Sequence, residues 1–275
     1  MGLDERGDIA VLELIVYTPI LVTSGILIFR HGLGRNAGWI YLLILSIIRI
    51  VGGSVHLASE LGDSNNTTLK IVFGILESAG LSPLLLATLG LLRTVAQRAF
   101  EGQITRLLHA FGLISGIALA LSITGGTQLA NADGDQSKLD SASKLRHIGA
   151  ILFLVLYVLV VIMHGIFWIR RHEIMKNRRK LLLGISATLP FLGVRVIYSV
   201  LASYAPLDPN DKGGLANFNS STGSWYIYLM MDVLSELFVV LIYTFVGITV
   251  PLDEDYKSTK MERWEDEEDR QTMLP

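Results

Sequence analysis

Seven apolar stretches alternate with polar connections along the chain, and each stretch is long enough to cross a bilayer as a helix. About 20 residues at 1.5 Å per residue are enough to cross the hydrocarbon layer. The pattern predicts spans over Ile9–Phe29, Ala37–Leu61, Leu69–Leu92, Leu107–Ala130, Ile148–Ile169, Leu181–Ser203 and Trp225–Ile248. It also predicts two longer polar loops, over Asn131–His147 and Tyr204–Ser224. We therefore expect one all-α domain, a seven-transmembrane helix bundle over residues 9–250, between an N-terminal tail (1–8) and a charged cytosolic tail (251–275).

Composition agrees with a multi-pass membrane protein. Of 275 residues, 51% are hydrophobic and only 17% are charged, whereas about 25% is usual for a soluble domain. The net charge of -2 gives no reason to expect a nucleic-acid partner, and without cysteine the chain has no disulfide or thiolate chemistry. The acidic start MGLDERGD is unlike a signal peptide, so the first stretch is expected to remain as a span. We expect an integral protein of the endoplasmic reticulum or plasma membrane; no protein partner is identifiable.

The distribution of lysine and arginine predicts the orientation of the chain. Fifteen of these residues fall in the tail after span seven and in the connections after spans one, three and five, against six on the opposite side. The positive-inside rule then places the C-terminus in the cytosol and the N-terminus outside it. Three sequons, at Asn65, Asn66 and Asn219, all fall on the predicted outer side, and Asn219 is the better candidate for glycosylation.

Charged residues inside the predicted spans are the main functional signal. Placing one near the bilayer centre costs roughly 2.5–3.5 kcal/mol, so such residues usually face a protein interior or a wet cavity. The spans carry Glu13, Arg49, Glu60, Glu77, Arg195, Asp232 and Glu236. Two arginines cannot neutralise five acids, so protonation, His56, water or a ligand must supply the rest.

Helical spacing and depth predict that these residues converge. Arg49, His56 and Glu60 share one face of span two, and the aromatic residues Trp225 and Tyr228 share a face of span seven with its two acids. At 1.5 Å per residue from the outer ends, one set of three (Glu77, Arg195, Asp232) lies about 12 Å deep and one pair (Arg49, Glu236) about 18 Å deep. We expect a cavity in the outer half of the bundle, lined in part by Tyr228.

Two ion pairs explain part of the excess of acids. The depths predict a pair between Arg195 and either Asp232 or Glu77, and another between Arg49 and Glu236. Such buried pairs can be purely architectural. Glu13 and Glu60 are expected to remain near the interface, where long side chains reach water cheaply. Glu77 or one acid of span seven then remains unpaired, and a carboxyl group in an apolar site tends to hold a proton that it can donate.

Motifs for cofactor or metal chemistry are absent from the sequence. There is no HExxH, GxSxG, GxxxxGK[ST], aspartate-rich diphosphate motif or dinucleotide fingerprint. We therefore expect no cofactor and no metal. Pro83 and Pro190 lie within spans three and six and should kink them.

Four segments carry a resemblance to a known family: RIVGGSVHLASEL, ESAGLSPLLLATLGLL, LPFLGVRVIYSVLA and DVLSELFVVLIYTFVGITV. In order, they resemble a family of fungal seven-transmembrane proteins with a domain of unknown function. The resemblance covers about residues 7–251 and implies a fungal source and a context in secondary metabolism, but it brings no activity. In size and span number the chain is also similar to fungal integral-membrane terpene cyclases and to lipid-translocating exporter-like proteins.

Three functions remain open, in the order enzyme, carrier and receptor, and the expected partner is a small lipidic ligand or substrate. The first is a membrane-embedded acid–base enzyme for an isoprenoid or lipidic metabolite, with Glu77 and Asp232 as catalytic acids oriented by Arg49 and Arg195. The second is a proton-coupled or lipid-exporter-like carrier, whose unpaired acids bind and release protons. The third is a seven-span receptor with a charged switch.

Overall fold

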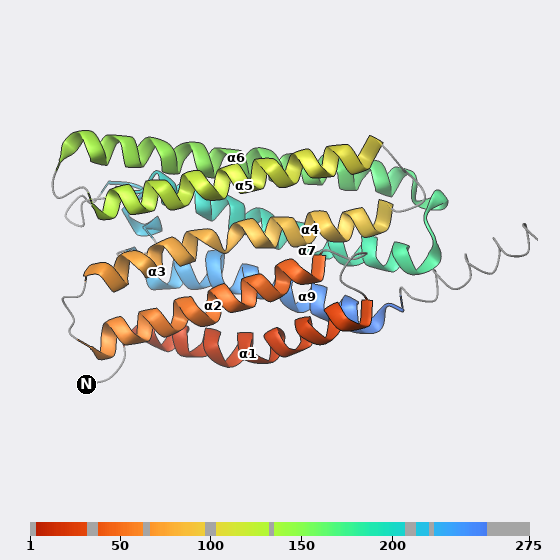
Figure 1. Ribbon diagram of the computed structural model, residues 1–275, viewed down its shortest axis with the longest axis horizontal. Helices are drawn as coiled ribbons and strands as arrows, with labels where there is room; N and C mark the ends of the chain where they lie inside the picture. Colours follow the sequence, from red (N-terminus) through yellow and green to blue (C-terminus); the bar gives the residue numbers. More distant parts are fainter. Residues whose placement is uncertain are drawn as a thin grey trace, which may run out of the picture.

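The computed structural model describes residues 4–31, 38–62, 67–96, 103–131, 135–206, 213–219 and 223–251. Every regular element within these ranges is helical, and the long helices lie lengthwise beside one another (Figure 1). The long helices are α1 (Glu5–His31), α2 (Gly38–Leu61), α3 (Thr67–Ala79), α4 (Leu81–Ala96), α5 (Gln103–Ala130), α6 (Gln136–Ile169), α7 (Lys176–Ser203) and α9 (Ser235–Thr249). The short elements are η1 (Arg171–Glu173), η2 (Ala216–Phe218), α8 (Trp225–Tyr228) and a π-helical turn, η3 (Leu229–Leu234). This confirms the predicted all-α fold.

Seven stretches of these helices are long and apolar enough to cross a membrane. They are Glu5–Arg30, Gly38–Leu61, Val72–Ala96, Arg106–Leu129, Gln136–Ile169, Lys176–Ser203 and Trp225–Thr249. Large apolar side chains also point outward; on α1, for example, Ile15, Val22, Ile26 and Phe29 are all exposed. The seven helices and their apolar exteriors fit a multi-pass membrane protein.

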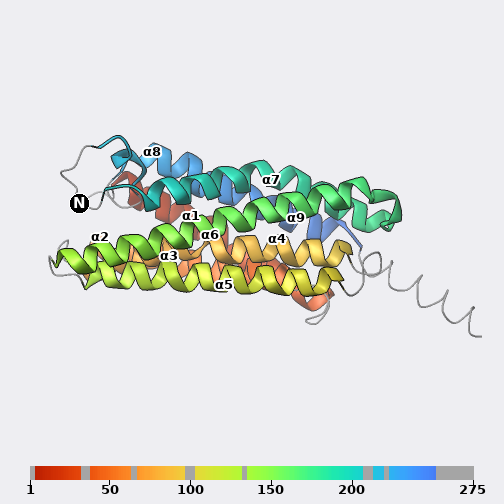
Figure 2. The same ribbon diagram turned by 90° about the horizontal axis from the view of Figure 1, so that it is seen from above.

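Helix α4 lies at the centre of the bundle. It contacts α2, α5, α6 and α7, while α1 and α9 contact each other and close the surrounding ring. Leu81, Leu84, Leu85 and Leu91 on α4 are inaccessible to solvent and belong to the main apolar core. Because the helices alternate in direction, the N-termini of α1, α3 and α8 lie at the same end as the C-termini of α2 and α7 (Figures 1 and 2). We call this end the N-terminal end of the bundle.

The prediction of a polar loop over Asn131–His147 is wrong for most of that segment, because it belongs to a helix. Helix α6 begins at Gln136, and the Asp135 side chain caps it by accepting a hydrogen bond of 3.0 Å from the backbone N–H of Ser137. Leu139, Ala142 and Leu145 recur every third residue, and Ala142 is fully buried. Because polar residues separate these three apolar ones, the segment resembles a loop, although the spacing of its apolar residues is that of an amphipathic helix.

Two predicted spans are interrupted close to their buried charged residues. The third is divided at Gly80 into α3 and α4, and Pro83 lies in the first turn of α4. The seventh contains the π-helical turn η3 between α8 and α9. Helix α7, by contrast, runs without interruption through Pro190. The break at Gly80 lies in the turn before Pro83, where proline removes a helical hydrogen bond, so the predicted distortion of span three is confirmed. The kink predicted at Pro190 is wrong, and the π turn in span seven was not predicted.

Candidate functional site

Six charged side chains meet inside the half of the bundle that contains its N-terminal end. They come from six elements: Glu13 (α1), Arg49 (α2), Glu77 (α3), Arg195 (α7), Asp232 (η3) and Glu236 (α9). We call them the charge cluster. None of the six is more than 4% exposed, so the charge cluster is closed to solvent. The predicted convergence by helix face and depth is confirmed for these residues.

Arg49 is the hub of the charge cluster. Its Nε and Nη2 atoms donate hydrogen bonds of 2.5 and 2.6 Å to the two carboxylate oxygens of Glu236. Its Nη1 atom donates a 2.6 Å bond to Glu77 and lies 3.8 Å from Glu13. The bidentate pair with Glu236 is the strongest geometry available to these groups. The pair between Arg49 and Glu236 that depth predicted is confirmed, and Glu77 is a second partner of the same arginine.

Arg195 makes the second set of pairs. Its Nη1 atom donates a hydrogen bond to Asp232 Oδ1, and its Nε atom lies 3.4 Å from Glu236 Oε2. Its Nη2 atom donates to the backbone carbonyl of Glu77 at 3.2 Å and lies 3.9 Å from that residue's carboxylate. Arg195 thus contacts both acids that the sequence offered as its partners, with Asp232 as the direct one.

The helix break at Gly80 explains how α3 meets the charge cluster. Only a 3.4 Å contact from the Gly80 N–H to the Glu77 carbonyl closes the turn, and Arg195 donates to the same carbonyl. A side chain at Gly80 would place its Cβ 3.1 Å from Arg49 Nη2 and 3.4 Å from Glu236 Oε2. Glycine therefore allows the backbone to approach the arginine–carboxylate pair without displacing the arginine.

The π-helical turn η3 carries Asp232 into the charge cluster. A π turn adds a residue to one turn of a helix and is often found at functional sites. Asp232 lies within η3, and Glu236 follows in the first turn of α9. Both side chains are completely buried. Helical spacing predicted that these two acids share a face, but it gave no signal for the π turn itself.

The charge cluster holds more acid than base. Four carboxyl groups face two guanidinium groups, so the net charge is -2 if all six are ionised. Glu13 Oε1 and Asp232 Oδ2 are buried and receive no hydrogen bond from the part of the chain that the structure describes. The Asp232 and Glu77 carboxyl groups lie within hydrogen-bonding reach of each other. Two carboxyl groups can share a hydrogen bond only if one of them holds a proton.

Glu13 belongs to this buried network, which corrects the expectation that it remains near the interface. The side chain is 3% exposed and lies on the inward face of α1 beside Arg49. Counting depth along one helix placed it too shallow. Contact with the long Arg49 side chain decides its position instead, because arginine reaches several ångströms from its own backbone.

Buried tyrosines surround the acids. Tyr17 donates a 2.8 Å hydrogen bond to Glu236 Oε1, so this carboxylate is contacted by both arginines and a phenol. Tyr198 and Tyr228 are 2% and 3% exposed and pack together in a small apolar cluster at the N-terminal end of the bundle. Tyr228 therefore lies near the acids, as predicted, whereas Trp225 is 44% exposed and does not line this interior. Tyr198 was not among the residues predicted to line this interior.

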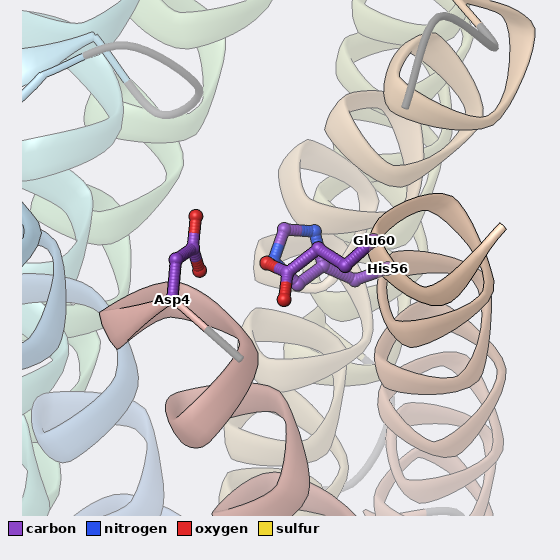
Figure 3. A group of neighbouring side chains, drawn as sticks. All are labelled: Asp4, His56 and Glu60. Atoms are coloured by element: carbon purple, nitrogen blue, oxygen red, sulfur yellow. The ribbon is translucent and has the colours of Figure 1, made fainter. Parts of the chain in front are cut away.

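His56 and Glu60 lie outside the charge cluster and face the start of α1. Their side chains project from α2 toward Asp4 (Figure 3), and His56 Nε2 is 2.9 Å from Glu60 Oε1. Burial raises the pKa of Asp4, but the contact with Glu60 and bonds from the backbone N–H groups of Gly7 and Arg6 outweigh it and leave that pKa below its usual value. The sequence analysis did not single out Asp4 because it lies outside the predicted spans, just before α1. Glu60 is partly exposed, as expected for an interfacial residue.

Among the three sequons only Asn219 lies within the described residues. Its side-chain amide donates a 3.0 Å hydrogen bond to the carbonyl of Pro206, next to the short helix η2. Asn65 and Asn66 lie outside the described residues. Glycosylation at all three stays a prediction.

Comparison with known proteins identifies a family but no activity. No curated protein and no solved structure is significantly similar to this chain. One family model, the domain of unknown function DUF7702, matches residues 3–253 and so includes all six residues of the charge cluster. The chain therefore belongs to the DUF7702 family.

Proposed function

We propose that the protein is a proton-coupled carrier of a small lipidic molecule, in which protonation of the charge cluster changes how the helices pack. The observation that carries this proposal is the excess of acid in a closed interior: four carboxyl groups against two guanidinium groups, all at most 4% exposed. Buried acids without full compensation are typical of proton relays in pumps and transporters.

The mechanism follows from which helices the two arginines connect. When Glu77 and Glu236 are ionised, Arg49 holds α2 against α3 and α9. When Asp232 is ionised, Arg195 holds α7 against η3. A proton on any of these acids removes one of these charge-assisted contacts and weakens the corresponding helix interface. Proton binding is thereby linked to opening of the bundle. A carrier of this kind must open its closed interior to bind or release its cargo.

A second candidate is a membrane-embedded acid–base enzyme acting on an isoprenoid or lipidic metabolite. The observation that favours it is the close approach of Glu77 and Asp232 beside the buried rings of Tyr198 and Tyr228. A proton held between these two carboxyl groups is positioned for transfer to an alkene, and aromatic faces stabilise a cation formed in a dry site. Fungal secondary metabolism is the context that we propose for either function.

Orientation and membrane complete the proposal. The excess of lysine and arginine at the opposite end of the bundle favours an N-terminal end that faces the lumen or the cell exterior. Asn219 would then carry a glycan, and the charge cluster would lie closer to the outer side. The plasma membrane and the endoplasmic reticulum both fit.

Metabolite profiling of cells and medium distinguishes the two candidates. Deleting the gene in the source organism should, for a carrier, shift one lipidic compound from medium to cells without changing its chemistry. For an enzyme, a precursor should accumulate and its product should disappear from both compartments.

The same strain also tests the residues. Complementation with Asp232→Asn or Glu77→Gln should fail, whereas Glu173→Gln, which alters an exposed acid of η1, should restore the wild-type profile. Identical metabolites in cells and medium of the deleted and wild-type strains would overturn both candidates.

A further inference from the structure

Three potential metal ligands from two helices meet at the N-terminal end of the bundle. They are Asp4, just before α1, and His56 and Glu60 in the last two turns of α2 (Figure 3). One ligand atom from each lies within 4.8 Å of the other two. From these residues we infer a binding site for a divalent transition-metal ion of the zinc type. This inference does not depend on the proposed transport or catalysis.

The spacing on α2 suits chelation by one helix face. Residues four apart in a helix lie one above the other, so His56 and Glu60 present an imidazole nitrogen and a carboxylate oxygen side by side. The two atoms are 2.9 Å apart. Ligand atoms bound to one zinc ion at about 2.0–2.2 Å are separated by roughly 3.3–3.5 Å, so an ion could bind between these groups after a small outward rotation.

Asp4 brings the third ligand and a second negative charge. Its Oδ1 atom already accepts hydrogen bonds of 2.9 and 2.8 Å from the backbone N–H groups of Arg6 and Gly7. This cap fixes the carboxylate, and the carboxyl groups of Asp4 and Glu60 come within hydrogen-bonding reach of each other. Two carboxylates at that distance repel unless a proton or a cation lies between them. The pair therefore favours a cation.

The Glu60 carboxylate faces the other two groups from a position shielded from solvent. Its two oxygens are buried, and Oε1 lies 2.9 Å from His56 Nε2. One imidazole can neutralise at most one of the two carboxylates, and a divalent ion bound by all three groups would neutralise both. Asp8 adds a further negative charge near Glu60.

The imidazole is held in place by an apolar neighbour. The His56 and Phe73 rings lie 4.4 Å apart between centroids at an angle of 35°. This contact from α3 restricts rotation of the imidazole, as outer-shell contacts do at known metal sites. The mixture of one nitrogen and two oxygen ligands suits zinc, cobalt or manganese better than calcium or magnesium, which prefer oxygen alone. Exposure of Asp4 leaves the site open to water, so a solvent molecule can complete the coordination.

Cobalt and zinc titrations of the full chain in lipid nanodiscs test the site. Adding Co²⁺ should produce visible absorption with a stoichiometry of one ion per chain, and Zn²⁺ should displace it because zinc binds such sites more tightly. Excess Mg²⁺ or Ca²⁺ should not displace it. Displacement by either would contradict the transition-metal assignment.

Conservative variants separate binding from folding. Three single variants each remove one ligand. Asp4→Asn keeps the helix cap, Glu60→Gln keeps the side-chain shape, and His56→Ala removes the imidazole. Each should weaken Zn²⁺ binding at least about tenfold. The matched control is His172→Ala on η1, where His172 Nε2 lies 3.6 Å from Glu173 in an exposed pair; it should bind zinc as the wild type does. No zinc binding by the wild type, or equal binding by wild type and the three variants, would overturn the inference.

Discussion

Glu13 and Glu236 are both buried glutamates, yet their surroundings differ. Glu236 accepts hydrogen bonds from Arg49, Arg195 and Tyr17, whereas Glu13 Oε1 receives none from the residues that the structure describes. Ionising a buried carboxyl group that has few donors costs free energy. Removing the partner of a buried, ion-paired carboxylate also costs free energy, because the charge is then left unpaired. Removal of these side chains should therefore have different consequences.

We expect Glu13→Gln to leave thermal stability unchanged or to raise it, because the neutral amide replaces a buried carboxyl group that must otherwise take up a proton to be buried beside three other acids. We expect Arg49→Gln to lower stability by about 3–5 kcal/mol, because it deprives Glu236 and Glu77 of their partner. Thermal unfolding of the purified variants in nanodiscs measures both effects. Equal losses of stability would show that ionised Glu13 is needed in the folded state.

Sequence could identify most of the charge cluster but not its contacts. The acids and arginines stand out because charged residues in apolar spans are rare, and counting residues gave the two arginine pairs. The same counting placed Glu13 too close to the surface and left either Glu77 or one acid of span seven unpaired. Side-chain length and the curvature of neighbouring helices decide these contacts, and neither can be obtained from spacing along one helix.

At the scale of elements, the division between α3 and α4 lies directly against the charge cluster. Gly80→Ala should place a methyl group against Arg49 and Glu236, and we expect a loss of about 1–3 kcal/mol of stability from the strained contact. Gly116→Ala in α5 is the matched control, because nothing lies within 4 Å of a Cβ at that position. The control should be neutral or slightly stabilising, since alanine favours a helix more than glycine does. Thermal unfolding of both variants provides the comparison, and a Gly80→Ala protein as stable as its control would exclude a role for close approach.

The existence of the long helices was predictable because hydrophobic length alone determines it. The π turn and the early beginning of α6 were not predictable. A π turn has no composition signal in LMMDVL, and the polar beginning of α6 concealed the apolar residues that face α5. Both features depend on tertiary packing, which overrides local preference when buried surface or an ion pair is gained.

For the whole molecule, the imbalance of charge predicts bound protons. Neutralising the charge cluster requires two protons per chain at neutral pH, since four acids oppose two arginines. Infrared spectra in nanodiscs at pH 7 should contain an absorption band of protonated carboxyl groups that exchanges slowly with deuterium. Glu13→Gln and Asp232→Asn should each reduce the band, and Glu5→Gln, at an exposed residue of α1, should leave it intact. A spectrum without the band would mean that all four acids are ionised.

Orientation in the membrane can be tested by cysteine labelling, because the chain contains no cysteine of its own that would react. Asn131→Cys lies at the N-terminal end of the bundle, after α5, and His172→Cys lies on η1 at the opposite end. A membrane-impermeant maleimide applied to intact cells should label Asn131→Cys and should reach His172→Cys only after permeabilisation. For a protein retained in the endoplasmic reticulum, sealed microsomes should give the reverse order of access. The opposite pattern in either preparation would refute the proposed topology.

The break at Gly80 also has an electrostatic effect deep inside the protein. Each end of a helix carries a partial charge of roughly half an elementary charge, negative at the C-terminus and positive at the N-terminus. The C-terminal end of α3 meets Arg195 through the Glu77 carbonyl, and the N-terminal end of α4 lies beside Glu236. The break therefore places a partial negative charge beside an arginine and a partial positive charge beside a carboxylate. Because a single residue separates the two segments, both helix ends meet the charge cluster at the same depth in the bundle.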